Sequence, residues 1–288
     1  MERLELTVTP ALAGRTVGSL MRRELAMSEG LISSAKFRPY GILLGGRQVR
    51  VTEIVAAGDV LSVHIGDRGR NEASPLDLPL TLLYEDDALA VADKPAGIGV
   101  YGEGTPNIAG IMAHKWGVDT EFHPVNRLDV GTTGIMVIAR DGYTHDRLRR
   151  MLHTEDFRRE YLAVAEGIVS PEPGTIDLPI SREPAEGTRR TVDPRGLPSR
   201  TEYTVLDVRG GRTLLRLRLL TGRTHQIRVH MAAIGHPLTG DPLYGVRDPD
   251  IHRPALHSHH LVLRHPISGD ILDLTSPLPP DMAALWEK

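Results

Sequence analysis

The pattern of hydrophobic and polar positions divides the chain into a short N-terminal part and a longer C-terminal part. Between them, residues 66–79 (GDRGRNEASPLDLP) are rich in glycine, proline and charge and have no apolar periodicity. Such a composition is typical of a linker. We therefore expect a small domain over residues 1–65, a linker over 66–79 and a second domain over 80–288.

The small domain combines helical and strand patterns. Apolar side chains at helical spacing predict one helix in residues 16–25, and residues 28–37 predict another, with Ser28 as its N-cap. Residues 41–49 predict a strand, a glycine turn and a second strand, and the alternation in 58–64 predicts a closing strand.

Strand patterns dominate the C-terminal part. The predicted strands cover residues 80–84, 88–92, 135–139, 161–166, 199–208 and 213–220. The predicted helices cover residues 107–116, 145–153 and 224–234. Because strands mostly follow strands, we expect an α+β fold with a mixed, largely antiparallel sheet and flanking helices.

Composition is that of a globular protein. Of the 288 residues 25% are charged and none is cysteine, which excludes disulfides and thiolate chemistry. The N-terminus has no apolar signal core, and no stretch approaches the roughly 18 apolar residues of a membrane span. We expect a cytoplasmic monomer, and nothing in the sequence indicates a membrane or a protein partner.

Arginine is abundant although the net charge is −3. Four of the 34 cationic residues are lysines and the other 30 are arginines, which make forked contacts to phosphate and stack on bases. Residues 208–240 contain six arginines and no acidic residue. A stretch that carries only positive charge indicates a local site for a polyanion. An arginine-rich genome would also raise the number of arginines.

The main candidate for chemistry is Asp129, in the sequence HPVNRLDVGTTG that precedes the apolar run 135–139. A carboxylate where a loop enters a buried strand is held rigidly and partly shielded from water. Under these conditions it can act as a nucleophile or a base. Alternatively, Asp129 caps a helix or pairs with Arg127.

Four further segments accompany this turn. They are YEDDALAVADKPAG (84–97), REYLAVAEG (159–167), LTGRTHQIRVHMA (220–232) with its continuation GHPL (235–238) and GD (240–241), and ALHS (255–258) followed by HP (265–266). In order, spacing and residue type, the five segments together resemble the RluA-type pseudouridine synthases over about residues 80–280. The resemblance implies the pseudouridine synthase fold and an enzyme that isomerises a uridine in structured RNA without a cofactor.

The resemblance gives Asp129 the catalytic role and Arg228 the role of stabilising its ionised form. The reaction breaks the bond from ribose carbon 1′ to base nitrogen 1, turns the base and rejoins it through carbon 5. Because the base stays bound, no electron or group carrier is needed. The aspartate attacks the ribose carbon or the base, or moves a ribose proton to give a glycal, and the sequence leaves these routes open.

The same resemblance assigns the remaining site residues. Tyr161 corresponds to the tyrosine that packs on the target base, from where it can assist proton removal from carbon 5. Arg127 corresponds to the arginine that inserts where the flipped base left the stack. Arg223 and His225 are expected to shape the pocket or to bind phosphate. The alternative is that Tyr161 is a core residue and Arg228 one more phosphate contact.

The motifs depart from the family at four positions. Asn126, Gly131, Thr133 and Arg159 stand where histidine, an acidic residue, serine and lysine are common. Gly131 is the least conservative change and puts the hydrogen bonding of the turn in question.

Histidines near residue 260 raise the possibility of a metal. His257, His259 and His260 lie on one predicted strand and have no acidic cluster beside them, a geometry that suits a metal ion poorly. We therefore expect no metal.

The small domain resembles an RNA-binding domain first described in a ribosomal small-subunit protein. The resemblance rests on the turn Gly45-Gly46-Arg47 and on Gly58-Asp59 before the last strand. In that family, paired helices present basic residues to folded RNA. The residues in comparable places are Arg22, Arg23, Lys36, Arg38 and Arg47. The alternative is a small domain with solvated arginines.

These patterns predict a pseudouridine synthase whose RNA is ribosomal rather than transfer RNA, and most of all large-subunit ribosomal RNA. One alternative is a catalytically silent RNA-binding or ribosome-assembly factor, which has no need of Asp129, Tyr161 and Arg228 together. Another is a hydrolytic nucleoside glycosidase, which requires a second carboxylate as general acid. No such partner for Asp129 is evident.

Overall fold

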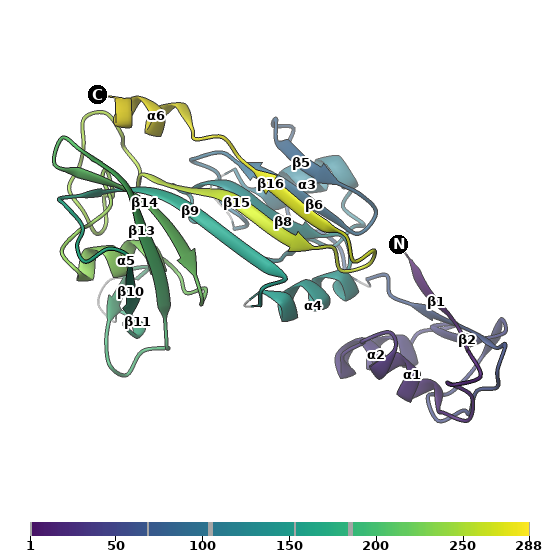
Figure 1. The fold of residues 1–288 in the computed structure, drawn as a ribbon. Helices are drawn as coiled ribbons and strands as arrows, with labels where there is room; N and C mark the ends of the chain where they lie inside the picture. Colours follow the sequence, from purple (N-terminus) through teal and green to yellow (C-terminus); the bar gives the residue numbers. More distant parts are fainter. Residues whose placement is uncertain (1, 68, 103–105, 153, 184–186, 288) are drawn as a thin grey trace.

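The computed structural model describes residues 2–67, 69–102, 106–152, 154–183 and 187–287. The N-terminal elements are β1 (Arg3–Thr7), α1 (Val17–Arg23), α2 (Glu29–Lys36), β2 (Ile42–Leu44), β3 (Arg47–Gln48) and β4 (Val60–His64). They form a four-stranded antiparallel sheet in the order β1-β4-β2-β3, next to the two helices (Figure 1).

Both predicted N-terminal helices are confirmed. Ser28 caps α2 as predicted, since its side chain accepts a hydrogen bond from the backbone of Leu31. The predictions from the sequence missed β1, although Leu4 and Leu6 alternate there with polar side chains. The alternation is short, and its partner β4 lies more than 50 residues further along the chain.

The remaining elements belong mostly to one large sheet. Its strands are β5 (Thr81–Glu85), β6 (Leu89–Lys94), β7 (His123–Pro124), β8 (Thr133–Ala139), β9 (Phe157–Glu166), β10 (Gly174–Asp177), β13 (Arg200–Arg209), β14 (Arg212–Leu219), β15 (Leu256–Arg264) and β16 (Ile271–Thr275). Outside it are the hairpin of β11 (Ile180–Arg182) with β12 (Arg190–Val192), and the helices α3 (Ile108–Trp116), α4 (Gly142–Met151), α5 (Gln226–Ala233) and α6 (Pro280–Glu287).

The large sheet is mixed and largely antiparallel, as the sequence predicts. Its order is β10-β13-β14-β9-β15-β8-β6-β5, with β16 beside β15 and β7 beside β8. The pair β15–β8 is parallel, and the other strand pairs in the described ranges are antiparallel. The predicted helix 145–153 begins earlier, at Gly142, and residue 153 lies outside the described residues.

Helices cover both faces of the large sheet at strand β8, which explains why residues 135–139 of this strand are an unbroken apolar run. Met136 and Ile138 pack in the cluster that contains residues of α3 and α5, whereas Ile135 and Val137 pack in the cluster that contains Leu148 of α4. Alternate side chains of a strand point to opposite faces, so a strand covered on both sides has no polar positions. This buried strand gives Asp129, just before it, a rigid support.

Residues 66–79 contain no helix or strand among those described, but they pack closely. Asn71 donates a side-chain hydrogen bond to Ala109 O at 2.8 Å, and the backbone of Leu76 donates to Gly110 O at 2.9 Å. Tyr143 of α4 belongs to the N-terminal hydrophobic cluster and donates to Leu25 O at 2.8 Å. The N-terminal unit is thus attached beside α4. No described helix has the length and hydrophobicity needed to cross a membrane.

Candidate active site

Asp129 lies in a tight turn that leads into β8. Its carbonyl accepts a hydrogen bond from Thr132 N at 3.0 Å, which closes the turn. Gly134 follows, with φ +102°, and a Cβ atom there would lie only 2.1 Å from Ser258 O of the parallel neighbour β15. Only glycine fits this close approach of two backbones, which fixes where the turn ends and where Asp129 is placed.

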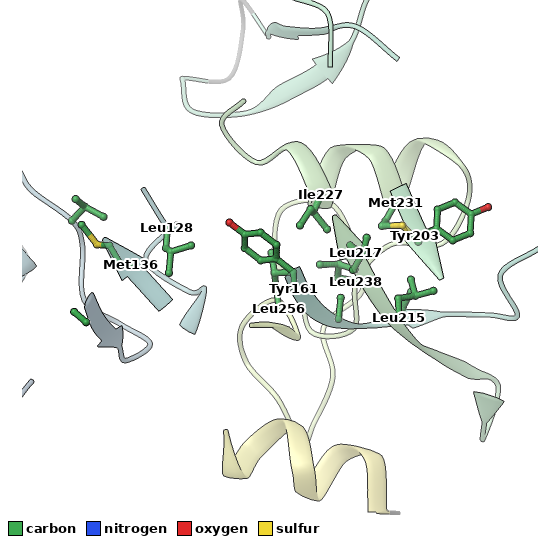
Figure 2. Packing of buried hydrophobic residues seen from close by; sticks show 14 of the residues in the cluster. Leu128, Met136, Tyr161, Tyr203, Leu215, Leu217, Ile227, Met231, Leu238 and Leu256 are labelled. Carbon is green, nitrogen blue, oxygen red and sulfur yellow. The ribbon is translucent and has the colours of Figure 1, made fainter. Parts of the chain in front are cut away.

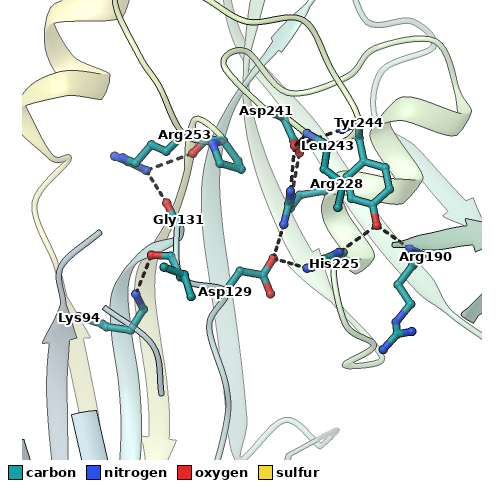
Figure 3. A network of polar contacts seen from close by, with 12 residues as sticks. Lys94, Asp129, Gly131, Arg190, His225, Arg228, Asp241, Leu243, Tyr244 and Arg253 are labelled. Atoms are coloured by element: carbon teal, nitrogen blue, oxygen red, sulfur yellow. Dashed lines mark hydrogen bonds and ion pairs between the residues drawn. The ribbon is translucent and has the colours of Figure 1, made fainter. Parts of the chain in front are cut away.

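An arginine joins Asp129 to a second, fully buried carboxylate (Figure 3). Arg228 Nη1 donates to Asp129 Oδ2 at 2.9 Å, and its Nε and Nη2 donate to the two oxygens of Asp241 at 2.7 and 2.8 Å. Asp241 is 0% exposed and also accepts from the backbone of Leu243 and Tyr244. The forked contact orients Arg228, and Arg228 orients Asp129.

Burial disfavours the charge of Arg228, but the hydrogen bonds to Asp241 and the charges of Asp241 and Asp129 outweigh burial and raise the pKa of Arg228. A permanently charged guanidinium therefore faces Oδ2 of Asp129. In the described part of the chain Oδ1 of Asp129 has no hydrogen-bond partner, and the side chain is 24% exposed. That oxygen is available to a substrate.

His225 also faces Asp129, with Nε2 at 3.7 Å from Oδ2. Burial is the largest cause that lowers the pKa of His225, so the neutral imidazole is favoured. The Tyr244 hydroxyl accepts from Arg190 N at 2.8 Å and lies 2.9 Å from His225 Nδ1, to which it can donate. In that arrangement the remaining ring proton is on Nε2, toward Asp129.

The backbone of His225 has φ +57°, in the left-handed region that non-glycine residues seldom adopt. It occupies the N-cap position of α5 but makes no capping hydrogen bond with its side chain. The side chain is used in the site instead, a use that is common for strained residues at functional sites.

A buried lysine supports the turn from the other side. Lys94 is 0% exposed and donates to the carbonyls of Pro95 and Ile98, both at 2.8 Å, and of Val130 at 3.3 Å. Burial lowers the pKa of Lys94 to about 8, although the charge of Asp129 opposes this. Lys94 therefore holds the backbone next to Asp129, and its own positive charge partly neutralises the charge of Asp129.

The lowered pKa predicts how stability depends on pH. Between pH 8 and about 10.5 the unfolded chain still binds the proton of Lys94, whereas the folded protein has released it. The contribution of Lys94 to the free energy of unfolding should therefore rise with pH across this window, by up to about 3 kcal/mol. Urea unfolding at pH 7.5 and pH 10 measures this change in the free energy of unfolding. The variant Lys94→Met, which has no titrating group at this position, is the reference. An equal pH dependence in both proteins would contradict the assignment.

All six residues that the sequence assigns to catalysis or substrate binding line one pocket. Its lining residues are Arg127, Leu128, Asp129, Thr132, Tyr161, Leu219, Arg223, His225, Gln226, Ile227, Arg228 and Leu256. Figure 2 shows Tyr161 between Leu128 and the larger part of the apolar cluster, with its hydroxyl directed toward the side on which Leu128 lies. The pocket thus combines an aromatic ring and aliphatic side chains with one carboxylate and several cations.

Two arginines at this pocket have local partners. Arg127 Nη1 donates to the hydroxyl of Tyr101 at 2.7 Å, and Arg223 Nε donates to Pro198 O at 3.3 Å. Asp129 therefore pairs with Arg228 and not with its sequence neighbour Arg127, so the alternative of a local pair is wrong. Arg127 is exposed at the pocket, where its guanidinium bonds to Tyr101.

Three of the residues that differ from the usual family pattern make defined contacts in the turn. Asn126 Oδ1 accepts from Val137 N at 2.8 Å, which ties the turn to β8. Thr133 Oγ1 lies 3.0 Å from His257 Nδ1. Gly131 O accepts from Arg253 Nη1 at 3.2 Å, and a Cβ at Gly131 would approach Pro254 Cδ to 3.0 Å. Glycine therefore suits this close packing, and the backbone of Gly131 still takes part in the hydrogen bonding of the turn.

A group of possible metal ligands lies elsewhere. It consists of Asp67, Glu121 and His123, none of which lines the pocket of Asp129. Asp67 Oδ2 lies 2.8 Å from His123 Nε2, and its Oδ1 accepts from Gly142 N at 3.0 Å. These contacts join the chain after β4 to β7 and α4, which gives Asp67 and His123 a structural role.

The basic residues predicted to bind RNA lie on the N-terminal unit in different settings. Arg22 pairs with Glu29 and Arg47 with Glu53 at the surface, and Arg23 and Lys36 are also exposed. Arg38 donates to Gly66 O at 2.5 Å and to Asp67 O at 3.3 Å, so it fastens the chain after β4.

Comparisons with known proteins agree with this fold. Residues 88–233 match the family model of RNA pseudouridylate synthases. The ribosomal large subunit pseudouridine synthase D of Nitrosomonas europaea is 37% identical, over 99% of this chain and 87% of that protein. The uncharacterized RNA pseudouridine synthase YjbO of Bacillus subtilis is 38% identical, over 91% and 95%. The structure of human RNA pseudouridylate synthase domain containing 1 matches with a TM-score of 0.59 and 25% identity, over 72% and 87%.

The chain therefore belongs to the RNA pseudouridylate synthase family. It is an RNA pseudouridine synthase, an isomerase that modifies RNA.

Sequence reasoning gave no role to Asp241, Tyr244, Lys94 or Tyr101. Asp241 and Lys94 lie in the motifs that carry the resemblance, but a motif does not tell which of its charged side chains are buried. Tyr244 follows Asp241 closely, and Tyr101 lies outside every motif, so no sequence signal would have found it.

Proposed function

We propose that this chain isomerises a uridine of large-subunit ribosomal RNA, with Asp129 as the catalytic residue and the uridine flipped out of the RNA. The observation that carries the proposal is the ion pair of Asp129 with Arg228 beside Tyr161 in one pocket. An ionised carboxylate with one free oxygen next to an aromatic ring suits attack on, or proton transfer from, a nucleoside.

Each residue then has a definite task. Arg228, fixed by Asp241, keeps Asp129 ionised and oriented, while Tyr161 and Leu128 contact the uracil ring. In the product a bond joins ribose carbon 1′ to base carbon 5. The proton of carbon 5 leaves and nitrogen 1 gains one, so no other reactant is consumed. Arg127 leaves Tyr101 and fills the space of the flipped base.

The ribosomal target has two supports. The relative from Nitrosomonas europaea carries the name of a ribosomal large-subunit enzyme. In addition, the N-terminal unit exposes Arg23 and Lys36 at the ends of its two helices, and cations of this kind bind the backbone of folded RNA. We further propose that the enzyme acts as a monomer, since the six site residues predicted from the sequence already meet in one pocket of a single copy of the chain. We also propose that it is cytoplasmic, as suits an enzyme that acts on ribosomal RNA.

Mapping pseudouridines across all RNA of a strain that lacks this chain tests the target. At least one pseudouridine of large-subunit ribosomal RNA should disappear, and it should return with wild-type protein but not with Asp129→Asn. If the lost sites lie only in transfer RNA, the ribosomal proposal fails while the enzymatic class stands.

A further inference from the structure

A tight turn between α2 and β2 places an aromatic residue where the backbone favours glycine. In Arg38-Pro39-Tyr40-Gly41, Gly41 N donates to Arg38 O at 3.0 Å, and Tyr40 has φ +54°. Proline at the second position and positive φ at the third are typical of a type II turn, whose third residue is usually glycine or asparagine. A bulky side chain there strains the backbone.

The fold gains little from the aromatic side chains of this segment. Tyr40 is 68% exposed, and Phe37, which caps the C-terminus of α2, is 71% exposed. Large aromatic side chains normally stabilise a protein by burial, which these two lack. Packing within the chain therefore explains neither the strain at Tyr40 nor the two exposed rings.

A basic hollow lies beside Phe37, and the turn of Tyr40 adjoins it, because Tyr40 N donates to Gln48 Oε1 at 3.3 Å and Gln48 lines the hollow. Phe37 lines a hollow together with Lys36, Arg47 and Arg50, and Lys36 Nζ lies 5.1 Å from the centre of the Phe37 ring. Arg47 is paired with Glu53, whereas Lys36 and Arg50 are exposed. Two cations next to exposed aromatic rings match a ligand that carries both negative charge and flat rings.

We propose that Phe37 and Tyr40 form a stacking platform for unpaired nucleotides of the RNA, with Lys36 and Arg50 at the neighbouring phosphates. The platform rests on the proposed RNA substrate and adds a second recognition site, on another domain than Asp129. It selects RNA with unstacked bases near the target, because bases within a continuous duplex do not expose their faces. The excess of positive charge favours RNA over a protein partner.

Binding measurements on the full-length protein test the platform. The probes are a fluorescently labelled hairpin with an unpaired loop and a fully paired duplex of the same length. Phe37→Leu and Tyr40→Gly should each weaken hairpin binding by about five- to a hundred-fold and leave duplex binding within two-fold. Ile168→Ala, which shortens another side chain that is 66% exposed, should change neither.

Salt dependence and thermal stability separate stacking from other roles. Lys36→Gln and Arg50→Gln should each reduce the slope of log affinity against log salt by about one unit, whereas Phe37→Leu should leave the slope unchanged. Tyr40→Gly should keep or raise the melting temperature, because glycine relieves the strained φ. A lower melting temperature would mean that the ring is structural and would overturn the proposal.

The outcomes distinguish this site from the proposed function. Equal loss of hairpin and duplex binding, or no loss of either, would refute the platform even if the enzyme modifies ribosomal RNA. Selective loss of hairpin binding would support the platform even if Asp129 proved not to be catalytic.

Discussion

Arg228→Met should lower kcat for pseudouridine formation by about 10²–10³-fold, the usual cost of removing one preorganised charged donor. The variant should also lose about 3–5 kcal/mol of stability, because Asp241 is fully buried and would keep a charge without its counter-ion. Chemical denaturation and steady-state kinetics measure the two effects. Arg195→Met, which breaks an exposed pair with Asp193, is the matched control and should affect neither.

A double variant separates these two roles of Arg228. Adding Asp241→Asn to Arg228→Met removes the unpaired charge, so much of the stability should return while kcat stays low. Recovery of both would mean that Arg228 acts through stability alone. Arg228→Lys should be intermediate, because lysine keeps the charge but cannot make the forked contact to Asp241.

Asp129→Asn should reduce pseudouridine formation by about 10⁴-fold or more, as expected when a group that acts directly on the reacting atoms is lost. Asparagine has the same shape and still accepts a hydrogen bond from Arg228, so the pocket should keep its geometry. RNA affinity should remain within a few-fold, since Asp129 is one small part of a large polar contact. Chromatography of digested nucleosides and RNA binding measure these effects.

Asp119→Asn is the control for this change, because the side chain of Asp119 is 88% exposed and pairs with Arg70 at the surface. It should be fully active. A parallel loss of activity and RNA affinity in Asp129→Asn would instead make Asp129 a binding residue.

Much of the fold was predictable because its signals are local. The apolar run of β8, the cap of α2 and the alternation of β4 each depend on a few neighbouring residues. The short strand β1 was missed because its stability comes from pairing with β4, at the other end of the N-terminal unit. The local sequence pattern also gives no indication that Tyr143 of α4 packs in the N-terminal core.

The site was predictable only in part. The pairing of Asp129 with Arg228 joins residues 99 positions apart, and it came from a family resemblance and not from periodicity. Asp241 and Lys94 became visible as parts of the site only in three dimensions, where both are completely buried. Arg127, the sequence neighbour of Asp129, bonds to Tyr101 instead, which shows how poorly proximity along the chain predicts ion pairs in a turn.

The central claim is that the carboxylate of Asp129 performs the isomerisation. Formation of the new bond expels the proton of uracil carbon 5, so RNA labelled with tritium at that position reports the chemistry directly. With enzyme in excess over RNA, the wild type should release the label in a single exponential phase. Asp129→Asn, bound to the same RNA, should release none above background over many wild-type half-lives. Release by Asp129→Asn within ten-fold of the wild-type rate would contradict the account.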